Sequence, residues 1–310
     1  MKNFLVTTGL ILLLFNVAQQ AWSERTDVKE NVAEVTLAEQ RLSRELAAAV
    51  SDGRVVNLGE GQQAFLGIFL ESQTQKSRGG IILLHDLNNH ADWPEVIAPL
   101  RRRLTRYGWN TLSIQLPPPP TMTAPIPQST DESSVTELEQ EIDRRVQAAI
   151  EYCRSQRIFN IVLLGHQFGA IMASRYLANK ASQDNSISAL VAVNLYSPAL
   201  DSEELPDLDT LSKIHGAFLE LIPDRIPRYA RELAEKRQTV MTRLGRDRYK
   251  QIHVMGADYT FSGAEFTLAS RIQGWLAKLA PSVEVQMAAP QGAANASTTQ
   301  TENDANNQPK

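Results

Sequence analysis

The sequence predicts an α/β fold in which a mostly parallel sheet is covered by helices on both faces. Apolar runs such as Gly80–His85 and Asn160–Gly165 are nearly continuous, as in strands that are buried on both sides. Amphipathic segments suited to helices alternate with these runs along most of the chain. Alternating strands and helices are typical of parallel sheets, because each parallel connection crosses over the sheet through a helix.

The expected elements follow from the apolar periodicity and from glycine and proline breaks. We expect strands at residues 55–58, 64–70, 80–85, 110–116, 160–165, 189–195, 216–222 and 249–255, and helices at 32–50, 93–107, 131–156, 168–179, 227–243 and 264–280. Gly59–Gly61 predicts a hairpin turn between the first two strands, and Pro117–Pro127 predicts a proline-rich loop. The chain from residue 55 to residue 282 is therefore expected to form the α/β domain.

The N-terminus has the pattern of a secretory signal peptide. Lys2 supplies a positive charge, Phe4–Val17 an apolar core, and Ala21-Trp22-Ser23 the small residues that precede a cleavage site. The apolar stretch is shorter than the roughly 20 residues that span a bilayer, although an uncleaved anchor is the alternative. We expect residues 1–23 to be removed on export to the periplasm, which would leave no stable transmembrane segment.

Two further segments flank the α/β domain. Residues 24–54 form a polar lead-in with a helical stretch, and residues 288–310 contain almost no large apolar residue. The second segment is predicted to be disordered, because it cannot bury enough apolar surface to fold. Cys153 is the sole cysteine, so no intramolecular disulfide can form, and we interpret it as a buried core residue.

Charge gives no reason to expect a nucleic-acid partner. The chain has 31 Lys and Arg residues against 35 Asp and Glu residues. A basic run, Arg101, Arg102, Arg103 and Arg106, falls on a predicted helix. We interpret this run as a solvated helix face, with an anionic partner as the alternative.

One motif predicts a special turn. The strand that ends at Leu164 runs into Gly165-His166-Gln167-Phe168-Gly169 and then into a helix. This is the setting of the nucleophile elbow, Gly-x-Ser-x-Gly, in which the central side chain is exposed above the sheet. Here the central residue is Gln167, whose carboxamide has no oxygen comparable to an activated serine hydroxyl. The elbow is expected to be present without its nucleophile.

With these residues the chain resembles the α/β-hydrolase superfamily from about Gln63 to Pro281. More closely, it is similar to a family of secreted Gram-negative proteins of unknown function, domain of unknown function 3530. The resemblance rests on Ile81-Ile82-Leu83-Leu84-His85-Asp86, Trp93-Pro94, Gly108-Trp109-Asn110-Thr111-Leu112-Ser113, Leu164-Gly165-His166-Gln167-Phe168-Gly169-Ala170 and Gly274-Trp275-Leu276.

The resemblance implies where a catalytic triad would stand. Active members often carry His-Gly after the first buried strand, where backbone amides help to form the oxyanion hole, and here Asp86 replaces that glycine. The triad order of serine, acid and histidine maps onto Gln167, Asp224 and Tyr259. Of the three positions, only Asp224 carries the residue type that is usual in the triad. Tyr259 would be a poor general base at neutral pH, because tyrosine has a pKa near 10.

Three functions stay open on these residues. The first is a non-catalytic protein that binds a small molecule or an envelope protein and needs no cofactor. Its candidate ligand-binding residues are His85, Asp86, His166, Gln167, Asp224 and Tyr259. The second is a hydrolase with a rebuilt, non-triad site. A metal site from His85, His90 and Asp86 is conceivable within it, although such loop residues are more often solvated turn formers. The third is a structural or envelope-assembly role without a pocket.

Overall fold

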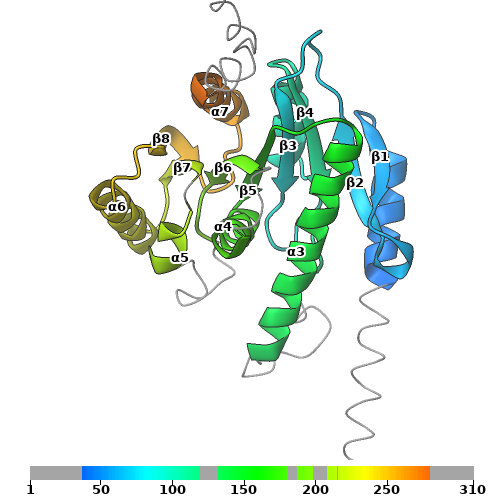
Figure 1. Ribbon diagram of the computed structural model, residues 1–310, viewed down its shortest axis with the longest axis horizontal. Helices are drawn as coiled ribbons and strands as arrows, with labels where there is room; N and C mark the ends of the chain where they lie inside the picture. The colour runs from blue at the N-terminus through cyan, green and yellow to red at the C-terminus, as the bar shows by residue number, and fades with distance from the viewer. Residues whose placement is uncertain (1–36, 119–131, 181–186, 198–207, 215, 280–310) are drawn as a thin grey trace, which may run out of the picture.

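An eight-stranded sheet runs through the protein in the order β1-β2-β4-β3-β5-β6-β7-β8 (Figure 1). This computed structural model describes residues 37–118, 132–180, 187–197, 208–214 and 216–279. The predicted signal peptide at residues 1–23 and the predicted disordered tail at residues 288–310 lie outside the described residues, as does most of the proline-rich loop.

The strands and helices alternate along the chain as the apolar pattern predicts. The strands are β1 (Arg54–Leu58), β2 (Phe65–Leu70), β3 (Gly79–Leu84), β4 (Trp109–Ile114), β5 (Ile161–His166), β6 (Ile187–Val193), β7 (Ala217–Arg225) and β8 (Tyr249–Asp258). The helices are residues 37–49, α2 (Ile97–Thr105), α3 (Glu132–Ser155), α4 (Phe168–Lys180), α5 (Leu208–Ser212), α6 (Arg228–Arg243) and α7 (Glu265–Leu279), with a short 3-10 turn η1 (Gly61–Gln63).

The sheet is mostly parallel, which confirms the predicted fold class. β1 pairs with β2, and β2 with β4, in antiparallel fashion. Every other neighbouring pair in the sheet is parallel. The carboxyl ends of β3, β4, β5, β6 and β7 therefore meet along one edge, which is where ligands bind in open α/β sheets.

Helices cover both faces of the sheet, and each face has its own core. Along β3, Ile82 belongs to the core that contains residues of α3 and α4, while Leu83 belongs to the core that contains residues of α2 and α7. Successive side chains of a strand point to opposite faces, so a strand buried on both sides needs an unbroken apolar run. This explains why Gly80–His85 contains no polar alternation.

The N-terminal helix, residues 37–49, packs against the domain. Leu46 lies in a small core with Leu66, Ile68 and Ala91. The Glu39 carboxylate binds the guanidinium of Arg145 on α3, with a shortest N–O distance of 2.6 Å. The predicted lead-in thus contains a helix that is anchored beside β2 and α3, and the first residues of the predicted helix, 32–36, lie outside the described residues. Of the helices described, none is long and apolar enough to cross a membrane.

Helix α2 begins at Ile97 and not at Trp93 as predicted. The residues before it form turns, and the Trp93 indole donates a hydrogen bond to the Glu95 carboxylate at 3.2 Å. The physical reason is that a residue preceding proline, here Trp93, is sterically disfavoured in the helical conformation. The short helix α5 was not predicted from the sequence.

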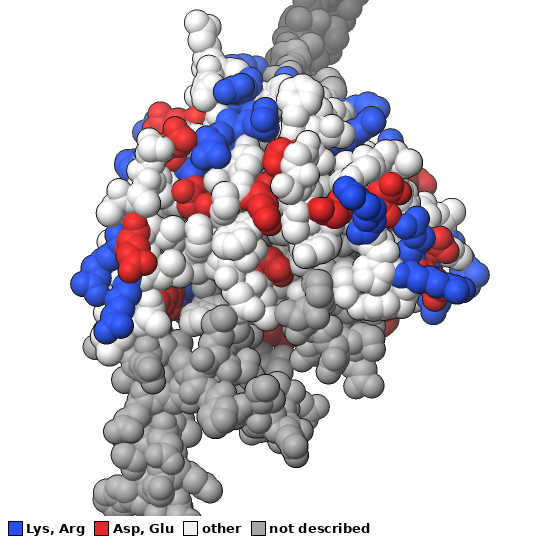
Figure 2. Space-filling view, turned by 180° about the vertical axis from the view of Figure 1, so that it is seen from behind, with Lys and Arg blue, Asp and Glu red and all other residues white. Residues whose placement is uncertain are grey.

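The basic run on α2 is a solvated face only in part, because Arg102 and Arg106 are exposed while Arg101 is buried. Arg101 is fully buried and binds the Asp92 carboxylate and the Asp52 carbonyl. Arg102 pairs with Asp52 at 3.4 Å, and Arg103 lies over the Phe266 ring. On the face shown in Figure 2, basic and acidic side chains are interspersed. Within the run, Arg101, Arg102 and Arg103 are therefore each engaged by other residues of the chain.

Candidate ligand-binding site at the elbow

The turn between β5 and α4 has the geometry of a nucleophile elbow. Gln167 has a φ of 49°, in the left-handed region that most residues avoid. Its backbone N–H donates to the carbonyl of Val193 at 3.0 Å. A side chain at Gly165 would collide with the backbone of Ala170, and one at Gly169 with the carbonyl of Leu84. The two glycines are therefore required by the turn, and the predicted strained conformation at Gln167 is confirmed.

The Gln167 side chain is folded back onto the protein. Its Nε2 donates to the carbonyl of Tyr259 at 3.0 Å and lies 3.3 Å from Nε2 of His166. Only 3% of Gln167 is exposed. The carboxamide thus fills the position above the sheet where an elbow normally presents its nucleophile.

Tyr259 faces the elbow through its backbone and not through its side chain. The side chain is 49% exposed, while the carbonyl accepts hydrogen bonds from Gln167 and His166. Sequence reasoning placed the phenol where a catalytic histidine would stand. The structure brings the correct segment to Gln167 but turns the phenol toward solvent.

Asp86 lies against the amide that follows the elbow residue. Its Oδ1 accepts a hydrogen bond from the Phe168 N–H at 2.9 Å and one from the Ser197 hydroxyl at 3.5 Å. In this fold the amide after the nucleophile is one of the donors of the oxyanion hole. Burial raises the pKa of Asp86 to about 6, against the opposing effect of hydrogen bonds from the Phe168 and Leu87 amides. The carboxylate therefore accepts a hydrogen bond from a backbone N–H that would otherwise be available to an oxyanion.

His85 is fixed by backbone groups on both sides. Its Nε2 accepts from the Leu116 N–H at 2.9 Å, so the proton is on Nδ1, which donates to the Asp86 carbonyl at 2.7 Å. Burial lowers its pKa to about 3, so the ring is neutral at physiological pH. Neither nitrogen is free to bind a metal, and the part of the chain that the structure describes contains no metal-binding group of three or more His, Cys, Asp or Glu.

His166 is buried beneath the elbow. It is 1% exposed, and its Nε2 lies 3.3 Å from the Tyr259 carbonyl. Burial lowers its pKa to about 4. Within the described residues its Nδ1 has no hydrogen-bond partner. Together with Gln167, this ring holds the segment after β8 against the end of β5.

Asp224, at the end of β7, is tied to the neighbouring strand. Its carboxylate accepts a hydrogen bond from the Gly256 N–H at 3.3 Å, and its carbonyl accepts one from Arg231 at 2.7 Å. The side chain keeps the place of the triad acid in the chain order. Its contacts join β7 to β8 and to α6.

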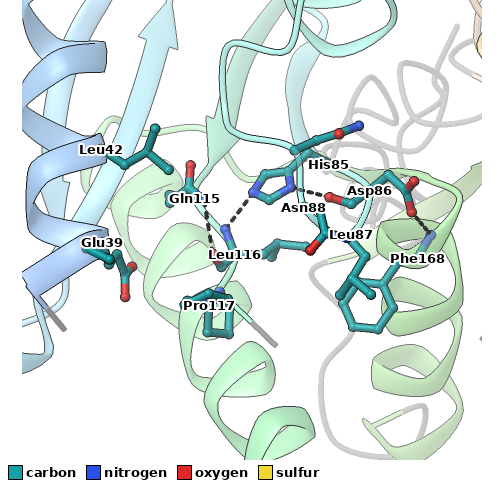
Figure 3. Close-up of a pocket in the computed structure, with 13 residues that line it drawn as sticks. Glu39, Leu42, His85, Asp86, Leu87, Asn88, Gln115, Leu116, Pro117 and Phe168 are labelled. Carbon is teal, nitrogen blue, oxygen red and sulfur yellow. Dashed lines mark hydrogen bonds between the residues drawn. The ribbon is translucent and has the colours of Figure 1, made fainter. Parts of the chain in front are cut away.

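A cavity of about 190 Å³ lies beside the elbow, between the N-terminal helix, the loop after β3 and the end of β4 (Figure 3). It is lined by Ala38, Glu39, Leu42, His85, Asp86, Leu87, Asn88, Asn89, Gln115, Leu116, Pro117, Pro118 and Phe168. Of the six candidate residues, His85 and Asp86 line this cavity, and the other four do not. Sequence reasoning missed the residues of the N-terminal helix, because no local motif connects them to the elbow.

The comparisons with known proteins place the chain in a family. The sequence profile of "Protein of unknown function (DUF3530)" matches residues 4–138 and 123–278. The chain belongs to this family. A search of curated proteins found no significant match.

Solved structures similar to this DUF3530 protein include several that are described as hydrolases or esterases. They include a putative dienelactone hydrolase from Klebsiella pneumoniae, with 13% identity, a TM-score of 0.54, and coverage of 72% of this chain and 97% of that one. A dienelactone hydrolase from Anabaena variabilis has 15% identity, a TM-score of 0.53 and coverage of 73% and 96%. Est1E from Butyrivibrio proteoclasticus has 12% identity, a TM-score of 0.51 and coverage of 73% and 98%. At such identities the likeness establishes the α/β-hydrolase fold.

Proposed function

We propose that this DUF3530 protein is a non-catalytic α/β-hydrolase-like protein of the periplasm that binds a small molecule or an envelope partner. The observation that carries the proposal is the hydrogen bond between the Asp86 carboxylate and the Phe168 amide. Ester hydrolysis on this fold needs a nucleophile, a base and donors for the oxyanion. Each of the three is occupied or replaced in the described site.

The residue at the nucleophile position is the first argument for a non-catalytic protein. Gln167 cannot attack a carbonyl, and its amide is already bonded to the Tyr259 carbonyl at 3.0 Å. A substrate carbonyl above the elbow would also have to displace this buried side chain. The neighbouring His166 has a pKa lowered to about 4 by burial, so it is a weak proton acceptor.

The position of the oxyanion hole is the second argument for a non-catalytic protein. A tetrahedral intermediate is stabilised by N–H donors aimed at its negative oxygen, and removal of one such donor costs about 100-fold to 1000-fold in turnover. Here the Phe168 donor is bound to Asp86, whose pKa of about 6 leaves it mostly ionised at pH 7.5. A developing oxyanion would meet a like charge instead of a donor.

The test is an esterase assay on the exported protein, with an active serine esterase as the positive control. We expect no burst with p-nitrophenyl butyrate and no labelling by a fluorophosphonate. Robust turnover that survives Gln167→Ala and is lost in His166→Ala or His85→Ala would overturn the proposal. That result would establish the hydrolase with a rebuilt site.

A further inference from the structure

We propose that the cavity beside the elbow binds a compound with a short apolar chain or single ring and a cationic or neutral head that donates hydrogen bonds, and that it excludes anions. This inference rests on the proposed non-catalytic function and specifies its ligand. It follows from the volume of the cavity, from the chemistry of its walls and from the way its polar groups are already bonded.

The volume and the apolar wall set the size of the ligand. The wall is formed by Ala38, Leu42, Leu87, Leu116, Pro117, Pro118 and Phe168, from four separate segments of the chain. A cavity of about 150 Å³ lined by apolar side chains is large enough to bind benzene. The 190 Å³ found here therefore accommodates one ring or a short alkyl chain.

The charges of the lining set the head group. Glu39 and Asp86 are its acidic residues, and in Figure 3 they lie at opposite ends of the cavity. Among the described residues that line the cavity there is neither lysine nor arginine. A carboxylate or phosphate would be desolvated there without a cationic partner, which is costly. An ammonium or hydroxyl group, by contrast, meets the carboxylate of Asp86, which can accept several hydrogen bonds, whereas the charge of Glu39 is already balanced by Arg145.

Three polar side chains of the wall, His85, Gln115 and Glu39, are already bonded to the protein. Both ring nitrogens of His85 are bonded to backbone groups. The Gln115 Oε1 accepts from the Ala91 N–H and its Nε2 donates to the Leu116 carbonyl, each at 3.1 Å. Arg145 holds the Glu39 carboxylate through two nitrogen–oxygen contacts. These three side chains are therefore held in place before a ligand enters, which reduces the ordering that opposes binding.

The experiment titrates the exported protein with hexylamine, hexanol and hexanoate at pH 7.5, followed by amide chemical shifts. We expect hexylamine to bind most tightly and hexanoate at least tenfold more weakly than the amine. Leu42→Trp fills the cavity and should abolish binding of the amine and the alcohol. Leu37→Trp is the matched control, because Leu37 is on the same helix, is 52% exposed and does not line the cavity.

Two charge-neutralising variants test the head group. Asp86→Asn should reduce the advantage of hexylamine over hexanol several-fold, while Glu45→Gln, at an exposed position on the N-terminal helix, should not. Hexanoate binding as tightly as hexylamine, binding that persists in Leu42→Trp, or binding of none of the three would overturn the inference. Esterase turnover would instead overturn the proposed function, so the two failures are distinguishable.

Discussion

At Asp86 a carboxylate stands where the resemblance to α/β-hydrolases implies that active members often carry a glycine, and the structure shows where that carboxylate is directed. It binds the Phe168 amide, 82 residues away in the chain. The sequence shows that an aspartate stands at this position, but it does not show where the side chain points. That orientation depends on how the loop after β3 packs against the elbow. Two predictions at the scale of single residues follow from this contact.

The first concerns stability and pH. The pKa of Asp86 is raised from 3.8 to about 6 in the folded protein, so the fold binds a proton more tightly than the unfolded chain does. The contribution of Asp86 to the stability of the fold is fully present below pH 3.8 and is lost as the pH rises through 6. Asp86→Asn should therefore be more stable than the wild type at pH 7.5, by on the order of 2 kcal/mol.

Urea denaturation between pH 4 and pH 8 measures this difference. The gain should disappear near pH 4, where Asp86 is protonated in the folded state. His85 and His166 impose the opposite trend on both proteins, because their lowered pKa values make stability fall below pH 6.5. Asp209→Asn, at an exposed position on α5, should show only a small change. A gain at Asp86 that is independent of pH would contradict the burial of its charge.

The second concerns restored chemistry. Gln167→Ser with Tyr259→His should give at most weak esterase activity, because Asp86 still occupies the Phe168 amide and position 259 faces solvent. Adding Asp86→Gly should raise turnover of p-nitrophenyl butyrate at least tenfold over the double variant, since it frees an oxyanion donor. Equal rates for the double and triple variants would show that this carboxylate is not the obstacle.

At the scale of elements, the sequence predicted the strands well and the site poorly. Buried strands such as β3 and β5 carry continuous apolar runs, and the elbow carries two glycines that its crowding requires. The start of α2 was wrong by four residues, 93 against 97, because the residue before Pro94 disfavours a helix. The outward turn of Tyr259 and the cavity wall from the N-terminal helix depend on tertiary packing, which no local pattern encodes.

A buried network joins β7 to α6 and permits a prediction at this scale. Glu220 is 0% exposed and binds Arg237, and it also accepts hydrogen bonds from Tyr249 and Gln251. The opposite charge helps to keep the pKa of Arg237 raised despite its burial. Glu220→Gln leaves a buried guanidinium without its counter-ion, so it should destabilise the fold by about 3–5 kcal/mol.

Urea denaturation at pH 7.5 checks this value against a matched surface pair. Lys213 and Asp209 are joined at 2.8 Å, but both side chains are more than half exposed. Asp209→Asn should cost less than about 1 kcal/mol, as for most exposed ion pairs. A loss at Glu220→Gln as small as this one would mean that the network contributes little to the packing of α6 on the sheet.

At the scale of the whole molecule, the candidate cavity depends on a segment outside the parallel sheet. The loops after β3 and β4 supply one side of it, and residues 37–49 supply the other. The helix is held by the Glu39–Arg145 ion pair and by a small apolar core around Leu46. Processing of the N-terminus therefore bears on the site, because a cut beyond residue 37 would remove part of its wall.

The last prediction concerns that processing. Lys2, the apolar segment Phe4–Val17 and the small residues Ala21 and Ser23 predict cleavage after Ser23. Such a cut leaves residues 37–49 intact, so export and a complete cavity are compatible. Intact-mass measurement of the exported protein should give a chain that begins at Glu24 and is recovered without detergent. Ala21→Arg should block the cut, because a large charged residue does not fit the position before the cleavage site. A wild-type product that retains residues 1–23 would show instead that the apolar segment stays as a membrane anchor, with the cavity held close to the bilayer.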